Sequence, residues 1–340
     1  MSSPVTVGVD GSPESMAAAE WAAGASELRG VPLRLVHADE WAGATVPGIG
    51  PDARRRRAEE LLAAAAETVR REHPSLEIDT RQLSGRPAAA LTADAAEAGL
   101  LVLGSRGLSG VRGFLLGSVS MATISATERP VVLVRTPGPV AAPDPSALTG
   151  PSRDVVVGVD IDQSFGPLLD FGFQEAARRG DRVVALYGWS IPPVVRDASA
   201  LVAAEREMGP DIGRRLAQDL RPWRRKFPSV DLVERACVGG PAQLLLHAAV
   251  GADLVVVGRR VRRGSLGTHI GSVTHAVIHH CAAPVAVIAV NDEAAADART
   301  TASPGGLSRE PDGGRRAREA PEAMRSALPP ACRTPNAERV

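Results

Sequence analysis

Hydrophobic residues in the first part of the chain form short, nearly continuous runs separated by stretches of mixed character. Runs of this kind predict strands buried on both faces, as in a parallel sheet. The runs are Val5–Val9, Leu33–His37, Leu100–Leu103 and Val131–Val134, with Ile78–Leu83 as a weaker candidate.

Apolar residues at helical spacing lie between these runs. Ser12 is placed to cap the first helix, with Pro13 at its first position and Gly30 at its end. Strands that alternate with helices predict an α/β domain with a doubly wound parallel sheet. The other predicted helices are one ended by Pro74, one that carries Leu91 and one that follows Gly117.

The whole pattern then returns, which predicts a duplicated domain. The segments Val5–Asp10, Leu101–Gly104, Gly117–Val119 and Pro130–Val134 return as Val155–Asp160, Val255–Gly258, Gly271–Val273 and Pro284–Ile288. We therefore expect domains at residues 1–136 and 153–291. The Pro-, Ala- and Ser-rich segment 137–152 is interpreted as a linker. Residues 292–340 have few large apolar side chains and are predicted to be a disordered tail.

The charge and composition of the chain exclude several classes of function. The chain has 39 basic and 39 acidic residues, so charge balance suggests no nucleic-acid partner. No apolar run is long enough to span a bilayer, so no membrane is expected. The start of the chain lacks the pattern of a signal peptide, and we expect a cytoplasmic protein. Lys226 is the one lysine, which excludes a P-loop.

Two loops that follow predicted strands have the composition of a binding site. Asp10 ends the first strand and leads directly into a helix; it also has a simpler interpretation, as a carboxylate that complements the helix dipole. The second loop, Gly104–Ser118, holds five glycines and two arginines. Glycines let backbone N–H groups close around an anion, and the helix after Gly117 offers further free N–H groups. This loop predicts a phosphate site.

At this point the sequence resembles the universal stress protein family. Nucleotide-binding members carry G-x2-G-x9-G-S/T after the fourth strand, and Gly104, Gly107, Gly117 and Ser118 match that spacing in full. The resemblance covers about residues 4–136 and 153–290. It implies two Rossmann-like sheets of five strands in the order 3-2-1-4-5, similar to adenine nucleotide alpha hydrolases. It also implies a homodimer through the last strand, Val131–Val134.

The resemblance further implies ATP or another adenine nucleotide, with Mg²⁺ as a further ligand, where strands one and four meet. Gly8 and Asp10 are expected against the adenosine half, with Val36 and His37 beside the adenine. The residues expected around the ribose and phosphates are Gly104, Ser105, Arg106, Gly107, Leu108, Ser109, Gly110 and Arg112, with Gly117, Ser118, Val119 and Ser120 at the helix start.

The second copy departs from this motif. Val261 stands where the middle glycine is expected, and its Cβ is predicted to obstruct a tight approach of the backbone. Ile161 replaces the glycine of the first loop. We expect this copy to bind nucleotide weakly, differently or not at all. Its candidate residues are Gly158, Asp160, Gly258, Gly271 and Ser272.

Three function classes remain open. A regulatory binding module, in which nucleotide changes conformation or dimerisation and so regulates an unknown protein partner, is favoured. An enzyme, either a slow ATPase or a nucleotidyl-transferring relative, is the second class; no catalytic set is apparent, and His37 is interpreted as a packing residue. A nucleotide-independent scaffold is the third. His275 and His279 have the helical spacing of a metal pair but no third ligand, so no metal site is predicted.

Overall fold

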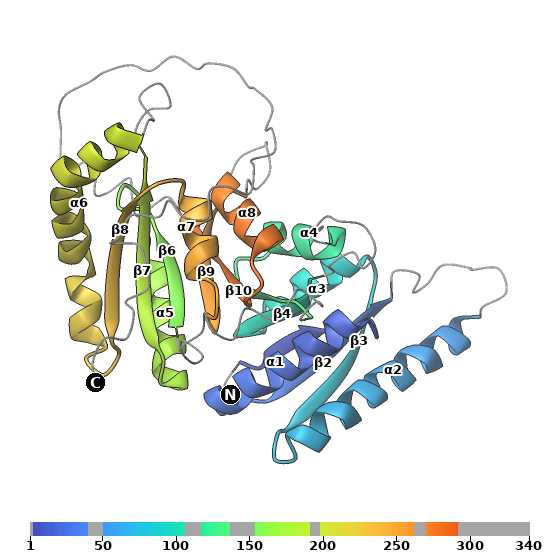
Figure 1. Cartoon of the computed structure of the whole chain (residues 1–340). Coiled ribbons are helices and arrows are strands. Elements are labelled where there is room, and N and C mark those ends of the chain that lie inside the picture. Colours follow the sequence, from blue (N-terminus) through green and yellow to red (C-terminus); the bar gives the residue numbers. More distant parts are fainter. Residues whose placement is uncertain are drawn as a thin grey trace, which may run out of the picture.

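The computed structural model describes residues 3–39, 50–105, 117–136, 154–190, 198–261 and 270–291. The predicted linker and tail lie outside these residues. The described chain forms a ten-stranded sheet in the order β3-β2-β1-β4-β5-β10-β9-β6-β7-β8, with helices on both faces (Figure 1).

The elements of the two domains follow the alternation that the sequence predicts. The strands are β1 (Val5–Gly8), β2 (Leu33–Asp39), β3 (Ile78–Ser84), β4 (Leu100–Gly104), β5 (Val131–Val134), β6 (Asp154–Val159), β7 (Arg182–Trp189), β8 (Leu232–Val238), β9 (Leu254–Val261) and β10 (Val285–Asn291). The helices are α1 (Pro13–Arg29), α2 (Pro51–Glu72), α3 (Pro87–Ala95), α4 (Ser118–Ala126), α5 (Gly166–Arg179), α6 (Ala198–Lys226), α7 (Pro241–Ala248) and α8 (Ser272–His280).

Local signals set the ends of α1. The Ser12 side chain accepts a hydrogen bond from the Ser15 N–H, and Pro13 occupies the first turn. Gly30 ends the helix in the left-handed region, with φ 60°, where a side chain is disfavoured. The predicted start and end of this helix are therefore confirmed.

Each half of the sheet has the expected strand order. In the first half it is β3-β2-β1-β4-β5, and in the second half β6 to β10 repeat the same arrangement. All neighbours within a half are parallel, whereas β5 and β10 pair antiparallel, with Leu133 opposite Val285 and Val131 opposite Val287. The two five-stranded sheets are thus confirmed, and they join into one.

This junction corrects the expected mode of dimerisation. The strand Val131–Val134 was expected to pair with a second chain. In the structure β5 has β4 on one side and β10 on the other, and β10 lies between β5 and β9. The backbone groups of both last strands are therefore paired within one chain, which leaves no edge there for a second copy.

The hydrophobic core is also continuous from one domain to the other. On one face of the sheet, α1 and α2 of the first domain and α5 and α6 of the second contribute to one buried cluster. On the other face, α3, α4, α7 and α8 contribute to a second cluster. Because each cluster includes residues of both domains, the domains share their cores across the β5–β10 junction.

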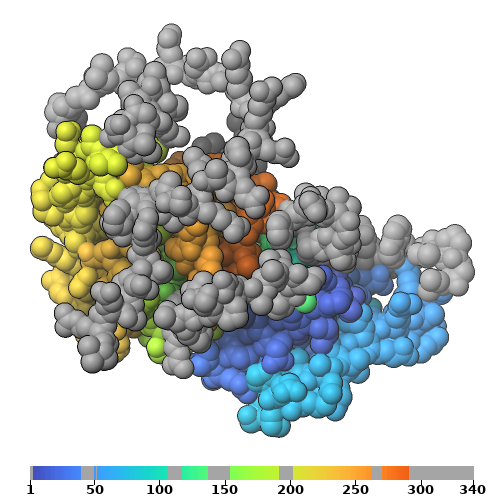
Figure 2. Space-filling model, in the orientation of Figure 1, coloured from blue at the N-terminus to red at the C-terminus, as the bar shows by residue number. Residues whose placement is uncertain are grey.

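Arginines reinforce the junction from both sides. Arg135 follows β5 and donates to the carbonyls of Ile278 and His279 at the end of α8, at 2.7 and 2.8 Å. Arg259 of β9 is 3% exposed and donates to the carbonyl of Thr127, which follows α4. Each domain thus satisfies carbonyls at a helix end of the other, and the two surfaces meet directly (Figure 2).

A buried carboxylate links α1 with α5. Glu175 is fully buried, and its Oε1 accepts from Arg29 of the other domain at 2.5 Å and from Arg178 at 2.8 Å. Arg179 lies 3.7 Å from the second oxygen and also stacks 5.1 Å above the ring of Trp21. One carboxylate therefore compensates three guanidinium groups at the domain interface.

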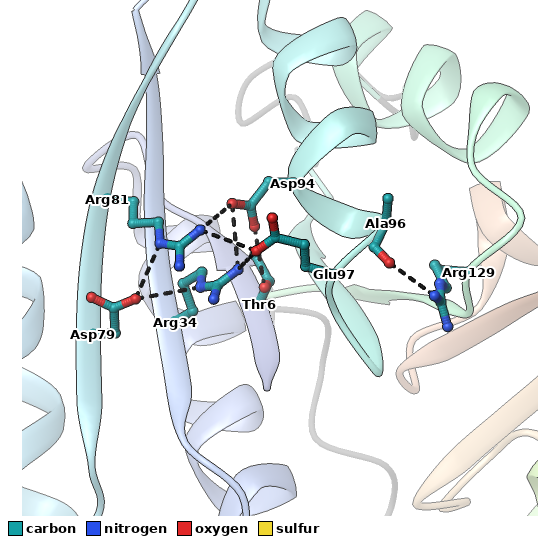
Figure 3. Close-up of polar contacts among 8 residues, drawn as sticks. All are labelled: Thr6, Arg34, Asp79, Arg81, Asp94, Ala96, Glu97 and Arg129. Atoms are coloured by element: carbon teal, nitrogen blue, oxygen red, sulfur yellow. Dashed lines mark hydrogen bonds and ion pairs between the residues drawn. The ribbon is translucent and has the colours of Figure 1, made fainter. Parts of the chain in front are cut away.

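A second charged network lies under α3 in the first domain (Figure 3). Arg34 of β2 and Arg81 of β3 both contact Asp79, Asp94 and Glu97, at 3.2 to 3.6 Å. Each arginine is compensated by carboxylates within the domain. The network therefore joins the outer strands to α3 and presents no free basic patch.

We expect Glu175→Gln to lower the free energy of unfolding by roughly 3 kcal/mol, because three arginines lose their buried counter-charge. Urea unfolding followed by circular dichroism measures the effect. Glu59→Gln is the control: Glu59 pairs with Arg55 on the surface of α2, where both side chains are more than half exposed, and we expect less than about 1 kcal/mol. Equal losses in the two variants would contradict the assigned role of Glu175.

His73 ties the end of α2 to α1. Its Nε2 lies 3.0 Å from a Glu20 oxygen and its Nδ1 lies 2.9 Å from a Glu27 oxygen. Burial is the largest single influence and opposes the charged ring, but the hydrogen bonds and charges of the two carboxylates together raise the pKa of His73.

A raised pKa in the folded state means that protonation of His73 stabilises the fold. We expect this contribution to be complete below about pH 6.5, the ordinary histidine value, and to be lost as the pH rises through the raised value. Unfolding midpoints of wild type and His73→Gln, measured from pH 5 to pH 9, should therefore converge at high pH. A constant difference across this range would rule out the contribution.

Candidate functional site

The first candidate site lies where the strand order reverses. β1 pairs in parallel with β2 on one side and with β4 on the other, with Gly8 opposite both Val36 and Leu103. Loops after β1 and β4 therefore leave the sheet at the same edge and diverge to opposite faces. In open α/β sheets this position forms a ligand-binding crevice.

Asp10 organises the turn between β1 and α1. Its Oδ1 accepts hydrogen bonds from the Ser12 N–H at 2.9 Å and from the Ser12 hydroxyl at 2.5 Å. Gly11 between them has φ 81°, which favours glycine. Asp10 is nevertheless exposed, so its carboxylate both holds the turn and lies at the surface of the crevice.

Packing explains two of the glycines at this edge. A Cβ on Gly104 would lie 2.6 and 2.7 Å from the backbone C and O of Glu14 and 2.8 Å from the Ser15 N. A Cβ on Gly8 would lie 3.0 Å from the side chain of Leu103. The first turn of α1 is thus pressed against the end of β4, and Gly104 is required there whether or not a ligand binds.

Gly117 differs from these two glycines. It precedes α4 with φ −60° and ψ 146°, values that any residue adopts, and a Cβ added there meets no atom of the described residues within 4 Å. No side chain caps α4, while Ser118 and Val119 of its first turn are exposed. Ser120 is buried, and its hydroxyl donates to the Gly104 carbonyl at 3.4 Å. The uncapped start of α4 is therefore held beside the end of β4.

Other predicted residues lie deeper than expected. The Val36 side chain is completely buried in the cluster beneath α3 and α4, and its carbonyl accepts from the Val9 N–H at 2.8 Å. The ring Nδ1 of His37 lies 2.8 Å from the Val9 carbonyl. Ser105 is 1% exposed, and its hydroxyl has no partner among the described residues. Val36 therefore supports the strand end and presents no side chain to the crevice.

Part of the predicted cradle lies outside the described residues. These positions are Arg106, Gly107, Leu108, Ser109, Gly110 and Arg112. What the structure brings together is the frame around them, formed by the Asp10 turn, the end of β4 and the start of α4.

The second domain encloses a cavity of about 720 Å³ at its own point of strand reversal. This volume is in the range of small-molecule sites. All five residues predicted for this copy line the cavity, namely Gly158, Asp160, Gly258, Gly271 and Ser272. As in the first copy, a hydroxyl of the helix, here Thr274 of α8, donates to the preceding strand, at the Gly258 carbonyl of β9, at 2.5 Å.

Val261, which stands where the motif has its middle glycine, lies in a strand. β9 continues through it, and Val261 pairs with Asn291 of β10. A β-branched residue suits a strand, and the neighbouring Arg259 and Arg260 extend the ladder with it. The second copy thus replaces the start of the glycine loop with sheet.

The cavity also has large apolar lining residues that the glycine motif does not predict. Its lining includes Phe165 before α5, Tyr187 and Trp189 at the end of β7, and Met208 and Ile212 of α6. Only ten aromatic residues other than histidine occur in the chain. A comparison of the two copies at the ends of their second strands would have indicated part of this lining, because His37 and Tyr187 occupy equivalent places.

Comparisons with known proteins agree with this arrangement. The universal stress protein family model matches residues 1–135 and 151–289. The chain belongs to the universal stress protein family. A universal stress protein of Mycobacterium tuberculosis is 32% identical over 315 residues, which cover 86% of this chain and 97% of the relative. One from Mycolicibacterium smegmatis is 31% identical over 298 residues, covering 84% and 96%.

A solved structure supports the two-domain fold of this universal stress protein. The crystal structure of a universal stress protein from Archaeoglobus fulgidus superposes with a TM-score of 0.61 at 18% sequence identity. It covers 85% of this chain and 99% of its own.

Two further features of this universal stress protein concern metals and membranes. The rings of His275 and His279 lie 4.2 Å apart on α8, and burial, followed by the charges of His279 and His280, lowers the pKa of His275. Across the described ranges, no three His, Cys, Asp or Glu side chains are grouped to hold a metal ion. None of the helices in that part of the chain has the length and apolarity to cross a bilayer.

The two kinds of glycine should respond differently to substitution. We expect Gly104→Ala to lower the free energy of unfolding by roughly 3 kcal/mol, because backbone atoms of α1 block the new methyl group. Gly117→Ala should cost less than about 1 kcal/mol, because the space is open and only helix capping changes. Urea unfolding of both variants tests this. A similar loss in the two would show that the packing assignment is wrong.

Proposed function

We propose that this universal stress protein binds ATP or another adenine nucleotide at the crevice of the first domain and uses it to regulate its conformation. The observation that supports this most directly is the start of α4. Among the described residues, no atom lies within 4 Å of a Cβ built on Gly117, its backbone angles suit any residue, and no side chain caps α4. A phosphate group approaching the backbone closely would account for these features.

The adenosine end is proposed to lie over β1 and β2. Asp10 is exposed at the end of β1, and its carboxylate is suited to accept hydrogen bonds from ribose hydroxyls. His37 contacts the Val9 carbonyl through Nδ1, so its ring is fixed beside the same edge. The residues present therefore fit a nucleotide with its base over β2 and its phosphates toward α4. A bound Mg²⁺ would neutralise phosphate charge.

The position of α4 supports a regulatory role. Its first turn borders the proposed phosphate site, and Thr127 at its other end accepts a hydrogen bond from Arg259 of the second domain. A nucleotide that draws the start of α4 inward would also strain this hydrogen bond between the domains. Because β5 and β10 already pair within the chain, we propose that the signal acts on the domain interface. A protein partner would recognise the surface at the domain interface.

We expect Asp10→Ala and Gly117→Ala each to weaken ATP binding to the first domain by at least tenfold, which is about 1.4 kcal/mol. Isothermal titration calorimetry on the full chain measures this. Gly271→Ala is the matched variant in the second domain and should leave the first-domain affinity unchanged. Unaltered affinity in both first-domain variants, with folding intact, would refute the site.

A turnover assay on the same samples separates binding from catalysis. Under the proposal, nucleotide recovered from the protein is unchanged after prolonged incubation. Steady release of phosphate that disappears in Asp10→Ala would instead establish the alternative, a slow ATPase. If the protein binds no nucleotide at all, the function class that remains is a nucleotide-independent scaffold.

A further inference from the structure

The second domain keeps one arginine of the charged network that lies under α3 in the first domain (Figure 3). The pairing registers of the two domains align Arg81 of β3 with Arg235 of β8. Helices α3 and α7 both begin at a proline, Pro87 and Pro241, which aligns the residues that follow. The other members of the network have no polar counterpart: Thr6, Arg34, Asp79, Asp94 and Glu97 correspond to Val156, Val184, Val233, Ala248 and Gly251. The second domain has thus kept the arginine and lost its carboxylates.

Arg235 is a buried arginine without a hydrogen-bonded partner. It is 8% exposed and makes no hydrogen bond or ion pair with any of the described residues. Burial is the largest influence on the pKa of Arg235 and lowers it, the charge of Asp154 opposes this effect, and the charge of Arg182 adds to it. The Asp154 carboxylate is itself bound by Nε and Nη2 of Arg182. A buried guanidinium without hydrogen bonds is costly, which points to a carboxylate supplied from outside the domain.

The strand that carries Arg235 is also an edge of the sheet (Figure 1). Over the described residues, β8 pairs with β7 alone and is the last strand of the sheet order. Edge strands are commonly protected by exposed charged or polar side chains. At the other end of the sheet β3 has exposed Asp79 and Thr80, whereas on β8 no charge is exposed, because Glu234 is bound by Arg224 of α6 and Arg235 is buried. Such an edge is suited to pair with an extended segment of another chain.

The charges on β8 indicate which kind of chain would fit. A second copy that paired through β8 would bring Glu234 as its acidic residue, but Glu234 lies on the opposite face of the strand from Arg235 and is bound to Arg224 at 2.7 Å. The second copy would also add another uncompensated Arg235. A different protein with an acidic residue fits better. Val250, two residues after Ala248 at the end of α7, is 60% exposed, so this side of the domain also presents apolar surface.

We propose that the β8 edge of the second domain is a docking site for an extended segment of a partner protein that carries an acidic residue. The segment pairs with the free backbone groups of β8, and its carboxylate forms the ion pair that Arg235 lacks within its own domain. No residue of β8 lines the cavity of the second domain, and the β5–β10 junction lies at the other side of that domain. The docking site therefore does not depend on nucleotide binding.

A matched pair of variants in the full chain tests the state of Arg235. Arg235→Met removes a buried charge that has no hydrogen-bonded partner, so we expect the urea midpoint to stay at the parent value or to rise. Arg81→Met breaks the ion pairs with Asp79, Asp94 and Glu97 and should lower the midpoint. A midpoint of Arg235→Met below that of the parent would show that Arg235 is compensated within the chain, and would overturn the proposal.

Docking is measured by fluorescence anisotropy with two labelled peptides, Thr-Val-Thr-Glu-Thr-Val-Thr and the same sequence with Gln in place of Glu. In an extended peptide of this pattern, the valines lie on the same face as the central residue. We expect the Glu peptide to bind the full chain at least about tenfold more tightly than the Gln peptide, because only a carboxylate pairs with the guanidinium.

The same preference is expected in Arg81→Met, whereas in Arg235→Met the two peptides should bind within about twofold of each other. The proposal is overturned if neither peptide binds the full chain, if the parent binds both equally, or if the preference for Glu persists in Arg235→Met. Calorimetry with ATP on the same variants should show unchanged affinity, so that failure of this docking site is distinguishable from failure of the nucleotide site.

Discussion

The antiparallel pairing of β5 with β10 is the contact on which the rest of the molecule depends. It satisfies the backbone groups of two strand edges that would otherwise be open to other chains. It also makes each hydrophobic cluster continuous from one domain to the other. With Glu175 holding Arg29 on one face and Arg135 and Arg259 satisfying helix ends, the two crevices are fixed relative to each other. Any signal between them has to pass through this junction.

Much of the fold could be predicted from sequence because its causes are local. Runs such as Val131–Val134 specify buried strands, while Ser12 and Gly30 specify the ends of α1. The pairing partner of β5 could not be predicted in this way. A short apolar strand at a sheet edge needs a neighbour, but its side chains do not distinguish the second domain of the same chain from another molecule. The repeat allowed either partner, and in the structure β5 pairs with β10 of the same chain.

The candidate site was predictable to a lesser degree. The glycine spacing pointed to the edge of the sheet where the strand order reverses, but it did not distinguish glycines with different causes. Gly104 is fixed by contact with the backbone of α1, whereas Gly117 has open space. That difference depends on how helix and strand approach each other in space. The burial of the Val36 side chain depends on the same kind of information, since it packs in the cluster that includes residues of α3.

In the second domain, the continuation of β9 affects both the proposed phosphate site and the contact between the domains. Arg259 and Val261 stand where the first copy begins its glycine loop, and in β9 they continue the strand instead. That continuation takes up the positions where the first copy has the start of the glycine-rich segment of the proposed phosphate site. It also carries the Arg259 side chain to the carbonyl of Thr127, where it closes the domain interface. Loss of the cradle and gain of the contact thus have one structural cause, because a loop residue cannot both wrap a ligand and serve as a strand residue at a buried junction. The aromatic residues at the end of β7 and before α5 lie outside that stretch, so the continuation of β9 does not account for their presence around the cavity.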